Sequence, residues 1–245
     1  EAAISFITEK LQAAKTAIAL PTQFCVNYGA KDLLLQFFNK SNIPFAATPM
    51  DKGVISEAHP NYLGIYTGMG STPADLRTRV EDADLVLDIG GVVFEDFNTT
   101  FWSDSIAAEK LLTIGDQFVR MGNTIFTGIT LTDVLGALLN KVAAIQSVEN
   151  KNNLPLLPLA GNPNDPTSSD NFYPRLQKML KSGDVLVVET GTCVMHATPM
   201  TLPDGAGFQA QTLWGSIGWA TPATEGICMA NKKGKIGRAS CRERV

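Results

Sequence analysis

Apolar strand-like runs alternate with amphipathic helical segments through the first 146 residues, and this alternation constrains the fold more than any other feature. Ile4, Ile7 and Leu11 recur at helical spacing within residues 1–15. A short apolar run over 17–20 follows. Regular alternation of this kind predicts βαβ units and a parallel sheet. The other elements that we expect here are helices over 29–40, 72–80 and 132–146 and strands over 43–48, 84–89, 111–114, 118–119 and 124–127.

Two helix starts and one strand end carry local signals. Thr72 with Pro73 predicts an N-cap and a first helical position, and Thr130 or Thr132 is expected to cap the later helix. The strand DLVLDI, residues 84–89, runs into Gly90-Gly91. Glycines in that place suit either a dinucleotide crevice or a structural turn, and the absence of a full G-x-G-x-x-G favours the turn.

The chain changes character between residues 147 and 167. This stretch is rich in Asn and Pro and lacks periodicity, so it is expected to be a linker. After it come a helix over 168–181, a strand over 184–190 and a helix over 218–231. The fold class predicted is therefore α/β, with a Rossmann-like parallel-sheet domain over 1–146 and a truncated second α/β domain over 168–234.

The C-terminal segment, residues 235–245, differs in composition from the rest. IGRASCRERV carries three Arg in ten residues, and one reverse translation of it resembles a common sequencing adapter. We expect this segment to be adapter read-through and exclude it from the prediction of the fold.

Charge and cysteine usage exclude several classes of partner. The net charge is −4 without a basic cluster, which argues against nucleic acid and anionic membrane surfaces as partners. No apolar run is long enough to predict a bilayer span. The four cysteines are far apart and form no CxxC pair, which disfavours a zinc site or a disulfide framework and suits a reducing cytoplasm.

Two segments of the second domain carry the specific signal for function. VVETGT, residues 187–192, is a strand that runs into a Thr-Gly-Thr turn suited to an anion or a polar ring. LWGSIGWATPATEG, residues 213–226, follows it. Gly215 and Gly218 permit close approach of a ligand to the backbone, and Ile217 projects an apolar side chain between them.

In this order, with Leu202-Pro203 between them, the two segments resemble the start of the diphosphate-binding domain of thiamine-diphosphate-dependent 2-oxo acid decarboxylases, the pyruvate and indolepyruvate decarboxylase group. Residues 43–68 and 80–99 are similar to the central domain of the same enzymes. The resemblance implies conversion of a 2-oxo acid to an aldehyde and CO2, with thiamine diphosphate and Mg²⁺ as cofactors. It also implies a cytoplasmic homo-oligomer, a dimer or tetramer, that acts on a small-molecule 2-oxo acid.

The resemblance assigns roles to particular residues. Cofactor binding falls on Thr190, Gly191, Thr192, Gly215, Ser216 and Ile217. The Gly215 carbonyl would accept a hydrogen bond from the aminopyrimidine, and Ile217 would support the bent cofactor. Val194 would lie near the substrate pocket.

Departures from the family pattern limit what the chain is expected to do. The metal-binding GDG motif does not occur in it, and neither does the amino-terminal domain that carries the activating Glu. Cys193 and Met195-His196 stand where Ser and aromatic or Asn residues are expected. We therefore expect an inactive fragment with no catalytic residue and no metal ligand of its own. A carboligating relative such as acetolactate synthase and a non-catalytic nucleotide-binding module are the alternatives.

Overall fold

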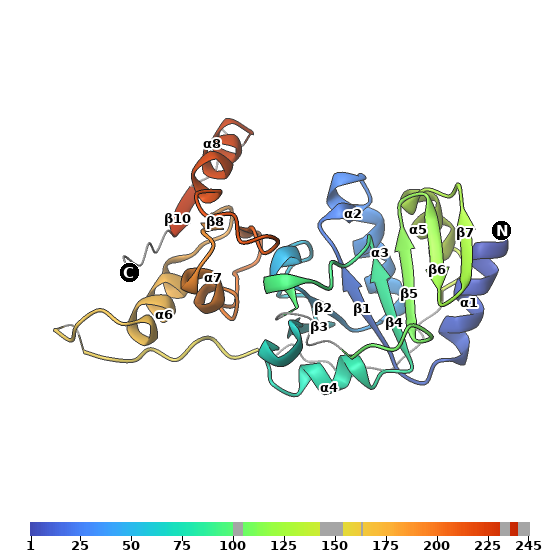
Figure 1. The fold of residues 1–245 in the computed structure, drawn as a ribbon, viewed down its shortest axis with the longest axis horizontal. Helices are drawn as coiled ribbons and strands as arrows, with labels where there is room; N and C mark the ends of the chain where they lie inside the picture. The colour runs from blue at the N-terminus through green and yellow to red at the C-terminus, as the bar shows by residue number, and fades with distance from the viewer. Residues whose placement is uncertain (100–104, 143–153, 163, 231–235, 240–245) are drawn as a thin grey trace. The chain divides into compact units, whose positions relative to one another are not determined.

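The computed structural model describes residues 1–99, 105–142, 154–162, 164–230 and 236–239, and the chain divides into two compact units (Figure 1). The first unit comprises Glu1–Ile55 and His59–Asn152, and the second comprises Ser56–Ala58 and Asn153–Val245. Parts of four expected segments lie outside the described residues: the end of the helix over 132–146, linker residues 147–153 and 163, residue 231, and most of the tail.

A seven-stranded sheet in the order β3-β2-β1-β4-β5-β6-β7 forms the centre of the first unit. Strands β1 to β5 are mutually parallel, which confirms the predicted α/β class and parallel sheet. Strands β6 and β7 run antiparallel because two-residue hairpins connect them to their neighbours, and a parallel crossover needs a much longer connection. The strands are β1 (Ala17–Pro21), β2 (Phe45–Ala47), β3 (Tyr62–Ile65), β4 (Leu85–Ile89), β5 (Leu111–Gly115), β6 (Phe118–Met121) and β7 (Thr124–Thr127).

Helices cover this sheet by packing apolar side chains on it. Phe38 stacks on Phe45 of β2 with ring centroids 4.4 Å apart, and Phe6 lies 5.5 Å from Phe126 of β7. Another core cluster joins Ile18 of β1 to the helix α4 through side chains that include Leu76 and Val80. The helices of the first unit are α1 (Ala2–Ala13), α2 (Phe24–Asn27), α3 (Lys31–Ser41), α4 (Leu76–Glu81) and α5 (Leu131–Leu139), with 3-10 turns η1 (Pro49–Asp51), η2 (Gly68–Gly70) and η3 (Asp96–Asn98).

The two predicted helix starts have different outcomes. Thr72 does not cap α4. Its N–H and C=O form hydrogen bonds, each 2.8 Å long, with Ile65, the last residue of β3, and the helix begins only at Leu76. Long-range pairing with a strand therefore overrides the local Thr-Pro signal. Thr130 does cap α5, because its side-chain oxygen accepts the N–H of Asp133 at 3.1 Å.

The Gly90-Gly91 pair forms a structural turn at the end of β4. Both residues have positive φ, 108° and 99°, which favours glycine. The carboxylate of Asp88 accepts the N–H groups of Gly91 and Val92 at 3.0 and 2.6 Å and so closes the turn. A Cβ at Gly90 would lie 2.1 Å from the Thr22 hydroxyl, so this glycine is needed for packing between neighbouring strands.

The second unit contains a three-stranded parallel sheet in the order β10-β8-β9. Strand β10 comes from the tail segment that the prediction of the fold excluded, and it pairs with the full length of β8. Neither the strand β9 nor the short helix α7 was predicted. The elements are α6 (Ser169–Met179), β8 (Val185–Val188), α7 (Thr192–Ala197), β9 (Gly207–Ala210), α8 (Ala220–Ala230) and β10 (Ile236–Ala239).

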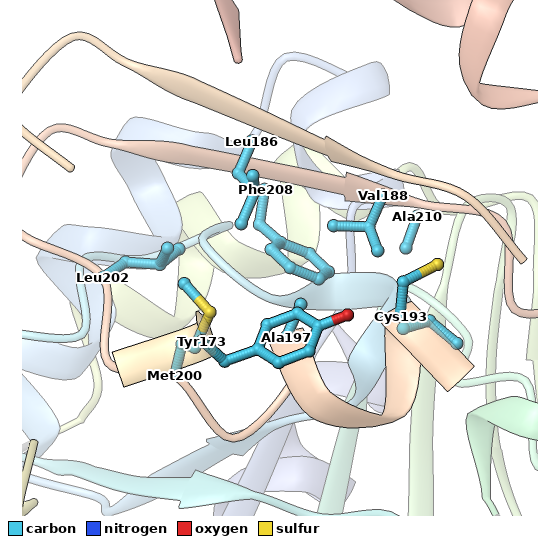
Figure 2. Close-up of a cluster of buried hydrophobic side chains, with 10 residues drawn as sticks. Tyr173, Leu186, Val188, Cys193, Ala197, Met200, Leu202, Phe208 and Ala210 are labelled. Carbon is cyan, nitrogen blue, oxygen red and sulfur yellow. The ribbon is translucent and has the colours of Figure 1, made fainter. Parts of the chain in front are cut away.

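One face of β8 and β9 carries the core of this unit. Figure 2 shows Leu186 and Val188 of β8 and Phe208 of β9 pointing toward Tyr173 and Ala197 of the helices. The same cluster also includes Cys193, Val194, Met200, Leu202 and Ala210.

In the described part of the chain, no helix has the length and hydropathy that crossing a membrane requires.

Candidate cofactor-binding site

The two predicted site segments come together at the carboxyl edge of the second unit's sheet. Thr190 follows β8, and Gln211 follows the parallel neighbour β9, so both lie at the same edge of the sheet. The Thr190 hydroxyl donates a hydrogen bond to the Gln211 carbonyl at 3.3 Å. Gln211 leads directly into the segment with Gly215, Ser216 and Ile217. Residues about twenty positions apart in the sequence are thereby joined.

The Thr-Gly-Thr segment is a tight link between β8 and α7. Gly191 has φ 132° and is exposed, and a Cβ built on it would meet no atom within 4 Å. Thr192 is also exposed and is the first residue of α7. The turn predicted over Thr190–Thr192 therefore ends before Thr192. The open space beside Gly191 leaves its backbone accessible to a ligand.

The loop of residues 213–219 holds two large apolar side chains in solvent. The exposed fractions are 80% for Trp214 and 83% for Ile217. Trp214 has φ 58°, a conformation that a bulky residue rarely adopts, and Gly215 and Gly218 have φ 52° and 95°. Uncommon backbone conformations of this kind gather at functional sites. The loop thus presents apolar surface and flanking backbone groups together.

A buried acceptor at this edge has no partner among the described residues. The side-chain oxygen Oε1 of Gln211 is inaccessible to solvent and receives no hydrogen bond there. An unsatisfied buried acceptor lowers stability, and a donor group supplied by a ligand would remove that cost. Gln211 was not predicted as a site residue, although it stands two residues before the LWGSIG segment.

Glu189 is the second residue that sequence reasoning missed. It follows β8 directly and is only 5% exposed. Its Oε1 accepts the N–H of Thr190 at 2.9 Å, and its Oε2 accepts the N–H of Ala220 at 3.2 Å. The sequence signal that could have indicated Glu189 is its position directly after the four apolar residues of β8. An acid next to a buried strand is expected to be buried itself, and a buried acid needs specific hydrogen-bond partners.

Val194 lies apart from the open side of this site. It lies in α7 with 5% exposure, and its side chain belongs to the hydrophobic core cluster of the second unit. The role near a substrate pocket therefore remains a prediction, and within this unit the observed environment of Val194 is that of a core residue.

Replacing Val194 with Trp is expected to lower the free energy of unfolding by about 1–3 kcal/mol, because a larger side chain overfills a packed core. The neighbouring Met195 is 54% exposed, so Met195→Trp is a matched control that should change stability by less than about 0.5 kcal/mol. Urea unfolding followed by far-UV circular dichroism measures both. Unchanged stability in V194W would reveal free space of the kind that a substrate pocket requires.

The site residues offer hydroxyls, backbone groups and apolar side chains for binding. Within the ranges that the structure describes, no three His, Cys, Asp or Glu side chains gather in a way that could hold a metal ion. The arrangement can hold a mixed polar and apolar ligand at the sheet edge, with donors and acceptors from Thr190 and Gln211 and an apolar contact from Ile217.

Comparison with known proteins covers both units. Residues 4–142 match the model of the thiamine pyrophosphate enzyme central domain. Pyruvate decarboxylase of Kluyveromyces marxianus is 30% identical over 227 residues, which is 91% of this chain and 40% of that protein. Pyruvate decarboxylase isozyme 1 of Saccharomyces cerevisiae is 31% identical over 234 residues, 93% of this chain and 40% of that protein.

These relatives are much longer than the chain, which spans about 40% of their length. The family model nevertheless matches more than half of the chain and coincides with the seven-stranded unit. The chain belongs to the thiamine pyrophosphate enzyme family, and its residues 4–142 are the central domain of that family.

Proposed function

We propose that this chain is part of a thiamine-diphosphate- and Mg²⁺-dependent 2-oxo acid decarboxylase that converts a 2-oxo acid of the pyruvate or indolepyruvate type to an aldehyde and CO2. The observation that carries this proposal is the junction of the Thr190–Thr192 turn with the loop of residues 213–219 at one sheet edge. The pyruvate decarboxylases among the relatives support the reaction type.

The residues at this edge fit thiamine diphosphate. The buried Gln211 Oε1 is an acceptor that receives no hydrogen bond among the described residues, and the cofactor's aminopyrimidine carries donors. The space beside Gly191 and Gly218 is open, since a Cβ at either position would meet nothing within 4 Å. Ile217 offers an exposed apolar side chain on which a ring can rest.

In the proposed mechanism these residues bind and orient the cofactor. The Gly215 carbonyl would accept a hydrogen bond from the aminopyrimidine, Ile217 would support the ring system, and Ser216 would flank it. Thr190, Gly191 and Thr192 would border the cofactor on the other side. When bound, thiamine diphosphate supplies the electron sink for the carbanion that forms as CO2 leaves.

The other parts of the site would come from residues that the chain does not contain. The GDG sequence expected to bind Mg²⁺ is absent from it. We therefore propose that the 245-residue chain does not turn over substrate, and that the parent protein acts as a cytoplasmic homo-oligomer on a small-molecule 2-oxo acid.

The test uses the product of the complete gene with thiamine diphosphate and Mg²⁺. Pyruvate and indolepyruvate are supplied separately, and both CO2 and the organic product are measured. Release of CO2 with an equal amount of aldehyde is expected. Acetolactate as the product would replace the proposal with a carboligating enzyme, which also releases CO2, and the absence of turnover would favour a non-catalytic module. The isolated chain should release no CO2 above background.

A variant pair links the activity to the loop. Ile217→Ala in the complete protein is expected to lower kcat about tenfold or more, because the cofactor loses support for its reactive orientation. Met229 is also an exposed apolar residue, 71% exposed on α8, so Met229→Ala is the control and should leave kcat unchanged. Equal activity of I217A and the unmodified protein would contradict the binding role of Ile217.

A further inference from the structure

Glu189 bridges the two segments of the candidate site. It is a buried carboxylate, 5% exposed, at the junction of β8 and the Thr190–Thr192 turn. We infer that Glu189 is a positioning residue that fastens the loop of residues 213–219 to this turn and thereby sets the orientation of Gly215 and Ile217. Its functional meaning rests on the proposed function.

The two oxygens of the Glu189 carboxylate serve different segments. Oε1 accepts the N–H of Thr190 at 2.9 Å, at the start of the turn. Oε2 accepts the N–H of Ala220 at 3.2 Å, at the end of the loop and the start of α8. Hydrogen bonds to a carboxylate are stronger than those between neutral groups, and the bond to Ala220 is buried while the bond to Thr190 is partly buried. One side chain therefore holds both segments by their backbones.

The loop has a particular need for this anchor. Trp214 and Gly215 both adopt left-handed backbone conformations, which are unfavourable for Trp214. The side chains of Trp214 and Ile217 are 80% and 83% exposed and so bury little apolar surface that would hold the loop. At its far end, by contrast, Ala220 is fully buried, and its N–H donates the hydrogen bond to Glu189.

The near end of the loop is attached independently of Glu189. The Thr190 hydroxyl donates to the Gln211 carbonyl at 3.3 Å, and a hydrogen bond from the N–H of Trp219 to the Ser216 carbonyl closes a turn inside the loop. The Glu189 bond to Ala220 is thus an attachment at the far end of the loop, and it restrains how far Gly215 and Ile217 can move relative to β8. Both Glu189 oxygens already accept hydrogen bonds, so this residue acts through the backbone and not on substrate.

The test compares Glu189→Gln with Glu225→Gln, an exposed residue on α8, in the 245-residue chain without cofactor. In E189Q one carboxylate oxygen becomes an NH2 group, which cannot accept a backbone N–H. Hydrogen exchange should show that protection of the Ala220 or the Thr190 amide falls about tenfold, the factor expected for loss of one such bond. Protection of β8 and the behaviour of E225Q should stay unchanged. Trp214 and Trp219 fluorescence should report altered loop exposure in E189Q.

Glu189→Asp keeps the charge on a side chain that is one methylene shorter, and it covers the case in which E189Q does not fold. A single methylene less prevents simultaneous contact with both amides, so partial loss of protection is expected in this variant. Unchanged protection at both amides in the two variants would overturn the inference.

The complete protein separates this inference from the proposed function. There, E189Q should lower kcat about tenfold while the KM for the 2-oxo acid stays within about twofold, since orientation and not substrate contact is lost. If the unmodified protein neither binds thiamine diphosphate nor turns over a 2-oxo acid, the proposed function fails. The hydrogen-exchange result still decides whether Glu189 fastens the loop of residues 213–219 to the Thr190–Thr192 turn. If E189Q loosens the loop but kcat is unchanged, the positioning role fails and the proposed function stands.

Discussion

Replacing Gly64 with Ala is expected to lower the free energy of unfolding of the first unit by about 3 kcal/mol or more, because the new Cβ collides with fixed backbone. Gly64 lies in β3 with φ 126°, and a Cβ there would stand 2.2 Å from the Thr72 carbonyl oxygen and 2.8 Å from Cδ of Pro73. Thr72 cannot move aside easily, since two hydrogen bonds of 2.8 Å bind it to Ile65. Urea unfolding followed by far-UV circular dichroism gives the change.

Gly29→Ala is the matched control for this substitution. Gly29 also has positive φ, 70°, but a Cβ at that position meets nothing within 4 Å. Its replacement should therefore cost only about 1 kcal/mol, the penalty of a left-handed conformation for a residue with a side chain. Equal losses of stability in the two variants would show that the contact with Thr72 is not the cause, and would contradict the explanation from packing.

The role of Gly64 also shows where prediction from the sequence stopped. Segments with strong local signals, such as the strand over 84–89 and the helix capped by Thr130, occur as elements β4 and α5. Thr72 instead pairs with Ile65 seven residues earlier, and this pairing depends on the position of β3 in the sheet. Strand β3 (Tyr62–Ile65) was not among the predicted strands, so its pairing with Thr72 could not be foreseen from the local Thr-Pro signal.

The candidate site shows the same division between local and long-range information. The sequence indicated Thr190–Thr192 and Gly215–Ile217 because glycines and hydroxyl residues in turns are local signals. Glu189 and Gln211 were missed because their roles depend on the folded edge of the sheet. Glu189 accepts a hydrogen bond from Ala220 there, and the Gln211 side-chain oxygen is buried without a hydrogen bond among the described residues. For Val194, the family resemblance predicted a role near the substrate pocket. Its buried environment results from the packing of α7 on the sheet, which the sequence did not indicate.

Stability of the first unit is expected to fall as the pH rises from about 5 to 7, because two buried carboxyl groups ionise in that interval. Burial is the main cause that raises the pKa of Asp51 from 3.8 to about 7 and the pKa of Asp88 from 3.8 to about 6. Between the unfolded and folded values, the folded protein retains a proton that the unfolded chain has released. The free energy of unfolding therefore decreases with pH, by about 1.4 kcal/mol for each pH unit and group.

His59 acts in the opposite sense, because burial lowers its pKa from 6.5, so the unfolded chain binds the extra proton below that pH. Comparison with the double variant Asp51→Asn, Asp88→Asn removes this contribution, since His59 is common to both proteins. The new asparagine at position 51 can still accept the N–H of Gln23 through its retained oxygen. The one at position 88 can likewise accept the N–H groups of Gly91 and Val92.

The difference in unfolding free energy between this double variant and the unmodified chain should consequently change by a few kcal/mol between pH 5 and pH 7, in favour of the variant at the higher pH. Urea titrations at half-unit steps of pH measure it. The coupling of the two sites makes the double variant more informative than either single one, because the charge on Asp88 itself contributes to the raised pKa of Asp51. Parallel stability profiles of the two proteins across this range would show that both carboxyl groups ionise in the folded protein as they do in the unfolded chain, and would contradict the raised pKa values of Asp51 and Asp88.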